Sequence, residues 1–264
     1  MLGDQTWVLT GAAGRIATSV RPALAEQVAR LRLVDLVPVT PEHDREESVV
    51  ADLRDPVAMR EVIAGADGVL HLGGLADEAP FDDLSAINIV GTFNVLEAAR
   101  LAGVARCVYA SSNRVTGFYP VSTVVGPDMP TRPDSLYAVS KVGGEGLASL
   151  YADKFHLSVI AIRIASFEEA PFDRRHLSTW LSPRDCQAAF LAAMRATDVT
   201  YAVFYGVSAN TRGWWDLTPG YRLGFHPVDN AEDYAGKIDL GPEPSPEDPQ
   251  GGTNASPERT LPYL

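Results

Sequence analysis

Three side chains in the middle of the chain have the types and the spacing needed to move a proton. Ser112 follows an apolar stretch, Arg106–Ala110, that we expect to be a strand; Tyr137 comes 25 residues after Ser112, and Lys141 four residues after Tyr137. The segment from Asp134 onward has the apolar spacing of a helix. Residues four apart on a helix project from one face, so we expect the ammonium of Lys141 beside the phenol of Tyr137.

The acidity of the phenol decides what this trio can do. A free tyrosine has a pKa of about 10, and lowering it to about 7 requires roughly 4 kcal/mol of preferential stabilisation of the phenolate. Lys141 could supply part of that energy, and a cationic cofactor ring could supply more. Ser112 would then hold the substrate oxygen while Tyr137 takes its proton and a hydride leaves the same carbon. Tyr-x-x-x-Lys also arises by chance on helices, so the trio needs support from the elements around it.

The N-terminal stretch supplies that support, because it has the pattern of a dinucleotide-binding turn. A short apolar strand, Thr6–Thr10, is followed by G-x-x-G-x-x-A at 11–17 and by a helical pattern to about Arg30. Glycines at such a turn let backbone amides approach a pyrophosphate at the helix N-terminus. The residues of this turn expected at the cofactor are Gly11, Ala13, Gly14, Arg15 and Ile16.

The next predicted strand, Leu31–Val34, ends in Asp35, 24 residues after Gly11. A carboxylate there can accept hydrogen bonds from both adenosine ribose hydroxyls, and it repels a 2′-phosphate. The sequence therefore predicts NAD rather than NADP as the cofactor. The alternative is that Asp35 merely ends a strand.

Further strands and helices alternate along the chain. We predict strands at 48–51, 68–72 and 157–164, a helix capped by Asp55, and a long helical segment, Phe81–Ala102, bent at Gly91. His71 lies within a strand and is interpreted as structural; no metal site is expected. The other residues expected at the cofactor follow strand ends or come from the Tyr137 helix: Asp52, Leu53, Leu72, Gly73, Gly74, Tyr137, Lys141 and Ile164.

This alternation predicts an α/β fold, a doubly wound parallel sheet of the Rossmann type, in residues 1–165. Ligands of such sheets bind beyond the carboxyl ends of the strands, where the candidate residues fall. Residues 166–240 are predicted to form a small substrate lobe, with Trp214 and Trp215 as packing anchors. Residues 241–264, rich in Pro, Gly and acidic residues, are predicted to be a surface-draped or mobile tail.

Composition limits the partners. The chain has 264 residues, a net charge of −12 and a pI near 4.8, which argues against nucleic acid or an anionic membrane. Its two cysteines are too few for a disulfide framework. The first residues show no signal peptide, and no apolar run approaches a membrane span. We therefore expect a cytoplasmic protein.

Beyond these general features, the chain resembles the extended short-chain dehydrogenase/reductase superfamily, and within it the bacterial uronate dehydrogenases. The stretches that carry the resemblance extend over nearly the whole chain: TGAAGRI at 10–16, HLGG at 71–74, PF at 80–81, ASSN at 110–113, GFYP at 117–120, GPD at 126–128, RPDSLYAVSK at 132–141, RHLSTW at 175–180, GVSAN at 206–210 and GWWD at 213–216.

The resemblance implies NAD-dependent oxidation of the anomeric hydroxyl of galacturonate or glucuronate to an aldarolactone, by a homo-oligomer. It assigns the general base to Tyr137, the tuning of that base to Lys141, and the orientation of the sugar hydroxyl to Ser112. The family's carboxylate-binding Ser and Arg match Ser166 and Arg175. Arg174, beside Arg175, is expected to point to solvent.

Other residues match the family's substrate pocket less closely. Asn113 matches a substrate contact. Two positions depart from the pattern: Ala76 stands where the family has Ser, and Arg114 where it has His. Both changes alter the shape and charge of the pocket, so Arg114 is a candidate for binding an acidic group.

Three alternatives stay open at this point. A dehydrogenase of the same fold could act on a different aldose or hydroxy acid, which Ala76 and Arg114 make more plausible. A nucleotide-sugar epimerase or dehydratase would need more room than about 75 residues of lobe provide. A non-catalytic NAD sensor would have no use for the Ser-Tyr-Lys trio.

Overall fold

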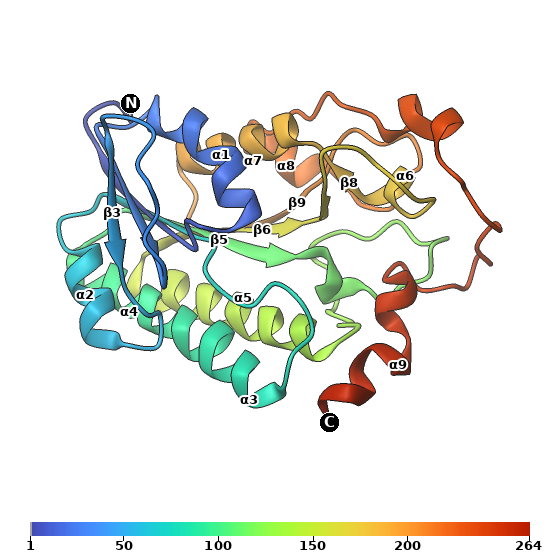
Figure 1. The fold of residues 1–264 in the computed structure, drawn as a ribbon, viewed down its shortest axis with the longest axis horizontal. Coiled ribbons are helices and arrows are strands. Elements are labelled where there is room, and N and C mark those ends of the chain that lie inside the picture. Colours follow the sequence, from blue (N-terminus) through green and yellow to red (C-terminus); the bar gives the residue numbers. More distant parts are fainter. Residues whose placement is uncertain (1) are drawn as a thin grey trace.

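A computed structural model describes residues 2–264 and contains a seven-stranded parallel sheet (Figure 1). The strand order is β3-β2-β1-β4-β5-β6-β9, and all six neighbouring pairs run parallel. The strands are β1 (Thr6–Thr10), β2 (Arg30–Asp35), β3 (Glu46–Val50), β4 (Gly68–His71), β5 (Arg106–Ser112), β6 (Ser158–Ile164) and β9 (Tyr201–Gly206). The predicted doubly wound fold is confirmed.

Helices cover both faces of the sheet, which is why its central strands are mostly apolar (Figure 1). One face carries α1 (Arg15–Ala25), α7 (Pro183–Arg195) and α8 (Thr218–Arg222). The opposite face carries α2 (Pro56–Ile63), α4 (Gly91–Ala102) and α5 (Leu136–Phe155), with the short α3 (Phe81–Leu84) at its edge. The strand order reverses between β1 and β4, so a crevice opens there at the carboxyl ends of the strands.

Local sequence signals place the N-termini of several helices. Asp55 caps α2 by accepting the N–H groups of Val57 and Ala58, with Pro56 at the first helical position as predicted. Ser135 caps α5 in the same way, through the N–H of Ala138. Helix α1 is shorter than predicted, because it stops at Ala25 and the chain turns into β2 at Arg30.

The helical segment at 81–102 is irregular in a way that the sequence did not reveal. A π-helical turn, Ser85–Val90, lies between α3 and α4, so the irregularity precedes Gly91. The turn places the buried Asn88 side chain against the chain after β4, where it accepts the N–H of Leu75 and donates to the Leu75 carbonyl. Such π-turns often accompany functional sites.

The boundary predicted at residue 165 does not coincide with the end of the sheet. Strand β9 pairs with β6, and α7 packs beside α1, so both extend the layers of the nucleotide-binding fold although they fall within 166–240. What lies over the carboxyl ends is a smaller set: a two-stranded sheet of β7 (Ser166–Phe167) and β8 (Trp180–Leu181), α6 (His176–Thr179) and a 3₁₀ helix, Ala231–Lys237. Trp215 packs as predicted, buried and stacked on Tyr205.

Residues 241–264 follow the end of the sheet at which the strands finish, and they contain a 3₁₀ turn, Gly252–Ala255, the helix α9 (Pro257–Thr260) and a final turn, Leu261–Tyr263 (Figure 1). Most of this segment is exposed, as predicted, but Gln250 is buried with 1% of its surface exposed. No helix within residues 2–264 combines the length and the apolar character needed to cross a membrane.

Candidate active site

A cleft of about 580 Å³ opens at the carboxyl ends of the strands, where the sequence placed the candidate residues. Its walls include nearly all of them. The predicted residues that line it are Gly11, Gly14, Arg15, Ile16, Asp35, Asp52, Leu53, Leu72, Gly73, Gly74, Ser112, Asn113, Arg114, Tyr137, Lys141, Ile164, Ser166 and Arg175. Ala13 alone does not line it.

One end of the cleft has the shape required by a dinucleotide. Gly11 has φ +70°, and a Cβ added to it would lie 2.7 Å from the backbone of Gly73. Only glycine therefore lets the β1 turn and the end of β4 come this close. Gly14 caps α1 without a side-chain hydrogen bond, which leaves the N–H groups of the first turn of this 11-residue helix free for a phosphate. These residues fit the pyrophosphate of NAD.

Two carboxylates stand farther along this end. Asp35 accepts the N–H of Ala13 through Oδ2 at 3.0 Å, so the role of Ala13 is to hold Asp35. Asp52 is paired with Arg54, and the hydrogen bonds from this guanidinium lower the pKa of Asp52. Arg54 also lines the cleft, and the sequence analysis did not identify it.

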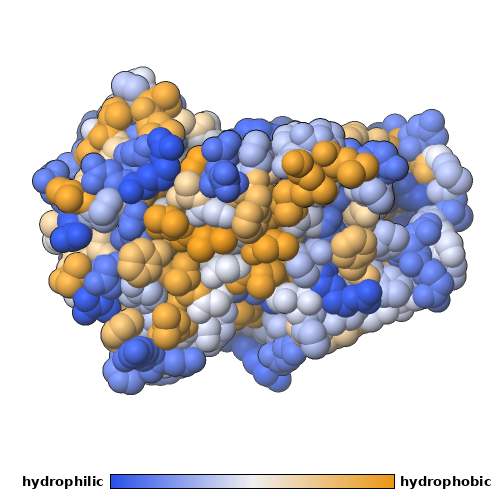
Figure 2. Space-filling view, turned by 90° about the horizontal axis from the view of Figure 1, so that it is seen from below, coloured by the Kyte–Doolittle hydropathy of each residue, from blue (hydrophilic) through white to orange (hydrophobic). Residues whose placement is uncertain are grey.

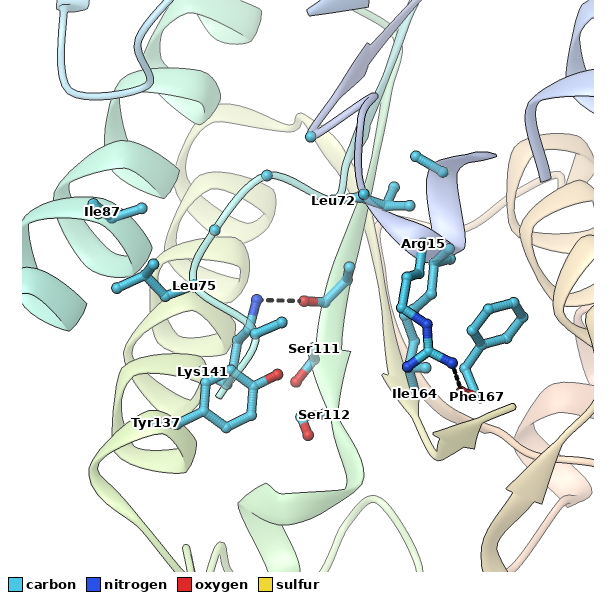
Figure 3. A pocket seen from close by; sticks show the side chains of 18 of the residues that line it. Arg15, Leu72, Leu75, Ile87, Ser111, Ser112, Tyr137, Lys141, Ile164 and Phe167 are labelled. Atoms are coloured by element: carbon cyan, nitrogen blue, oxygen red, sulfur yellow. Dashed lines mark hydrogen bonds between the residues drawn. The ribbon is translucent and has the colours of Figure 1, made fainter. Parts of the chain in front are cut away.

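Arg15 lies on the wall opposite Tyr137 (Figure 3). Its guanidinium donates to the carbonyl of Phe167 and forms a 2.6 Å ion pair with Glu168. The side chain thus connects the first turn of α1 to the chain after β7.

At the other end of the cleft, the side chains of Ser112, Tyr137 and Lys141 come together (Figure 3). All three are buried. Nζ of Lys141 donates to the carbonyl of Ala110 at 2.9 Å and lies 5.8 Å from the centre of the Tyr137 ring. The trio therefore meets at the end of β5, as the spacing in the sequence predicted.

Burial dominates the acidity of these groups. It raises the pKa of Tyr137 above its ordinary value, while the Ser112 hydroxyl and the charge of Arg114 act in the opposite direction. Burial also lowers the pKa of Lys141, to about 8. Additional positive charge is therefore needed beside Tyr137 before its phenol can serve as a base at neutral pH.

The neighbouring Ser111 belongs to a different network. Its hydroxyl donates to Glu145 at 2.6 Å, and Glu145 is held by a buried ion pair with Arg163 at 2.9 Å. Ser111 also lines the cleft, next to Ser112, but its hydroxyl is engaged by Glu145 (Figure 3). The Glu145–Arg163 pair was not predicted, because nothing in the local sequence of either residue marks it.

Arg114, the candidate for binding an acidic group, is paired with two carboxylates of the chain. Its Nε binds Asp134 at 3.0 Å and its Nη1 binds Asp77 at 3.2 Å, so two carboxylates offset its charge. The guanidinium lies over the Tyr137 ring, 5.4 Å from its centre. Burial raises the pKa of Asp134, and Arg114 counteracts it. Arg114 lines the cleft and connects the β5 end to the 73–78 loop, and its buried Nη2 makes no hydrogen bond within residues 2–264. Asn113, beside it, is buried with its amide near Ser112.

Ser166 and Arg175 are adjacent, as the resemblance implied. Nη1 of Arg175 donates to Oγ of Ser166 at 3.1 Å, and Nε donates to the carbonyl of Gln250 at 2.8 Å. Its Nη2 makes no hydrogen bond within residues 2–264 and remains for a ligand. Burial lowers the pKa of Arg175, to about 10. Arg174 was predicted to point to solvent, and that prediction was wrong: it donates to the carbonyls of Leu240 and Gly241.

Two supporting residues were missed by the sequence analysis. Glu78 accepts the N–H groups of Leu136 and Tyr137 and so caps the helix that carries the phenol. Asn88 fixes the chain after β4, as described above. His71 is structural, as predicted: its ring nitrogens lie 2.8 Å from Oγ1 of Thr10 and 2.9 Å from Oγ1 of Thr92.

Comparison with known proteins gives a consistent result. The model of the NAD dependent epimerase/dehydratase family matches residues 7–200. Among characterised proteins, the uronate dehydrogenase of Agrobacterium fabrum is 44% identical over 251 residues, which cover 93% of this chain and 95% of the relative.

Solved structures agree. Glucuronic acid dehydrogenase from Chromohalobacter salexigens superposes with a TM-score of 0.91 at 39% identity, covering 97% of each chain. A tyrosine-to-alanine mutant of the uronate dehydrogenase from Agrobacterium tumefaciens, complexed with NAD, superposes with a TM-score of 0.90 at 42% identity, covering 96% of this chain and 97% of that one.

Proposed function

We propose that this protein oxidises uronic acids with NAD, because the chain belongs to the NAD-dependent epimerase/dehydratase family and, within it, to the uronate dehydrogenases. The bond oxidised is the anomeric C–H, and the product is the lactone of an aldaric acid. NAD, when bound, supplies the acceptor for the hydride. The observation that carries the proposal is the meeting of Ser112, Tyr137 and Lys141 at one end of a dinucleotide-shaped cleft that also contains Arg175.

The residues of the chain divide the remaining work. The phenolate of Tyr137 takes the proton of the anomeric hydroxyl, while Ser112 donates a hydrogen bond to the same oxygen. Lys141 stabilises the phenolate electrostatically, and the Ala110 carbonyl keeps its ammonium in place. As the C–H bond breaks, the C=O bond of the lactone forms, so the substrate loses one proton and one hydride.

Recognition of the acid group falls to Arg175 and Ser166. The unused Nη2 of Arg175 can donate to a carboxylate, and the Ser166 hydroxyl can do so once it turns away from Thr179 Oγ1, which it contacts at 2.9 Å. Arg114 is paired with Asp77 and Asp134, but its buried Nη2 makes no hydrogen bond within residues 2–264, so it is a second donor for an acidic group. This arrangement favours sugar acids over neutral aldoses of the same ring size.

Formation of NADH with a panel of uronic acids and the matching neutral aldoses tests the function. We expect turnover with galacturonate or glucuronate and at least tenfold lower kcat/KM with the neutral sugars. Equal rates with neutral sugars would favour an aldose dehydrogenase instead. If NAD binds but no sugar is oxidised, the dehydrogenase proposal fails.

We also propose that the protein works as a homo-oligomer in a reducing compartment, the cytoplasm. Apolar side chains gather on the face formed by the helices below the sheet (Figure 2), among them Phe93 and Leu101 of α4 and Leu150 and Phe155 of α5, each more than 40% exposed. A second copy would bury them. Both cysteines are buried free thiols, Cys107 and Cys186. Light scattering of the wild type and of Phe93→Glu tests the assembly, since the variant should dissociate.

A further inference from the structure

The chain after residue 248 lies against the end of the cleft where the substrate is expected. Pro249 pairs with Pro120, and the backbone N–H groups of Gln250 and Gly251 donate to the carbonyls of Tyr119 and Gly117 at 2.8 Å each. The buried side-chain amide of Gln250 donates to the carbonyls of Pro120 and Thr123. We call residues 249–260 the closing segment.

The closing segment touches the residue assigned to the substrate carboxylate. The Gln250 carbonyl accepts Nε of Arg175 at 2.8 Å and thereby turns the other guanidinium nitrogens toward the cleft. Gly252 has φ +58°, and a Cβ added to it would lie 3.1 Å from Cδ of Arg175. Two residues later, Asn254 lines the cleft itself. Its side-chain amide makes no hydrogen bond within the part of the chain that the structure describes.

The far end of the closing segment holds the loop that forms the opposite wall. Arg259 forms an ion pair with Asp77, and Oγ1 of Thr260 donates to Glu78 at 2.7 Å. Glu78 is the residue whose carboxylate also caps the Tyr137 helix. The segment therefore connects Arg175, the 73–78 loop and the first turn of α5 around one opening.

We propose that the closing segment is a wall of the substrate site and that Asn254 is a specificity residue that binds the sugar ring. This inference rests on the proposed function. A neutral amide offers both a donor and an acceptor, which suits ring hydroxyls, while Arg175 takes the carboxylate. Arg259 and Thr260 are positioning residues, because they act on the substrate only through Asp77 and Glu78.

Steady-state kinetics with galacturonate and glucuronate test this assignment. Asn254→Ala should raise the KM for the sugar acid about 3- to 10-fold, as expected for one lost hydrogen bond. It should change kcat and the Kd of NAD by less than twofold. Thr260→Val should raise the same KM, and Thr260→Ser, which keeps the hydroxyl, should restore it. Arg259→Gln should raise this KM as well. Arg212→Gln, its matched control, should not, although Arg212 and Arg259 are similarly exposed and each pairs with one carboxylate.

A second measurement does not depend on turnover. In Tyr137→Phe saturated with NAD, galacturonate or glucuronate should slow amide hydrogen exchange in residues 249–260, whereas NAD alone should not. Unchanged KM values in Asn254→Ala and Thr260→Val, with no protection of 249–260, would overturn the inference while leaving the proposed function intact. If the wild type oxidises no uronic acid, the proposed function fails and the inference falls with it.

Discussion

Nζ of Lys141 lies 5.8 Å from the centre of the Tyr137 ring, and the Ala110 carbonyl holds this ammonium in place. The two residues are one helical turn apart in α5, so the helix itself sets their spacing. Both side chains are buried, and burial opposes the charge that each must carry. The chemistry therefore depends on a pair whose charged forms support each other.

Tyr137→Phe should abolish turnover, because it removes only the oxygen that we propose takes the proton. We expect kcat to fall by at least about 10³-fold, at the level of lost general-base catalysis. The Kd of NAD, measured by fluorescence titration, should change by less than about threefold. A large loss of NAD binding would show instead that the residue is structural.

Lys141→Met should shift the pH dependence of activity. Without the ammonium, the burial that raises the pKa of Tyr137 is opposed by less positive charge. The pH at which log kcat/KM rises should therefore be higher than in the wild type by at least about one pH unit, in line with the loss of a nearby cation. Profiles from pH 6 to 10 with saturating NAD check this, and identical profiles would remove Lys141 from its role.

Arg175→Gln should lower kcat/KM for uronic acids about 10²- to 10³-fold, the range for losing one partner of a desolvated charge pair. Neutral aldoses should be affected less than threefold. Arg175→Lys keeps the charge but not the paired donors, so it should recover only part of the loss. A uniform loss on acidic and neutral sugars would contradict a carboxylate-specific role.

Asp35→Asn tests the cofactor preference. The amide can still accept the N–H of Ala13, but it no longer repels a 2′-phosphate. The ratio of kcat/KM for NAD to that for NADP should fall by at least about tenfold, equivalent to about 1.4 kcal/mol. A ratio unchanged from wild type would mean that Asp35 does not face the ribose.

His71 should make the fold sensitive to acid. Burial lowers the pKa of His71 to about 3, with a further contribution from Lys141, so the ring stays neutral in the folded protein. In the unfolded chain it binds a proton below about pH 6.5. The unfolded state thus holds more protons between pH 6.5 and 3, and stability falls as the pH falls through this window.

Denaturant unfolding at several pH values measures the effect. Between pH 6 and 4, the free energy of unfolding should change less steeply with pH in His71→Gln than in the wild type. The difference in slope should be up to about 1.4 kcal/mol per pH unit, whatever the variant's stability at neutral pH. Equal slopes in the variant and the wild type would rule out this group as the cause.

The sequence predicted the sheet and the meeting of Ser112, Tyr137 and Lys141 because local rules govern both. A parallel sheet brings the ends of its strands to one edge, and a helix places residues 137 and 141 on one face. Asp35 and Gly11 could be located for the same reason.

Contacts between distant segments could not be predicted in this way. Glu78 caps α5 from 59 residues away, and the Gln250 carbonyl binds a guanidinium 75 residues earlier. The pairing of Arg114 with Asp77 could not be predicted, because Asp77 lies on another loop, 37 residues away. A polar composition at 241–264 indicated exposure, but it carried no information about which few residues would be buried.

The position of Gln250 has a consequence for how the protein assembles on the ribosome. The seven strands of the sheet have been translated once residue 206 has emerged. Arg175 still lacks the Gln250 carbonyl at that stage, because the carbonyl is translated later. The hydrogen bonds that hold Arg175 are therefore completed only after the whole sheet has been translated.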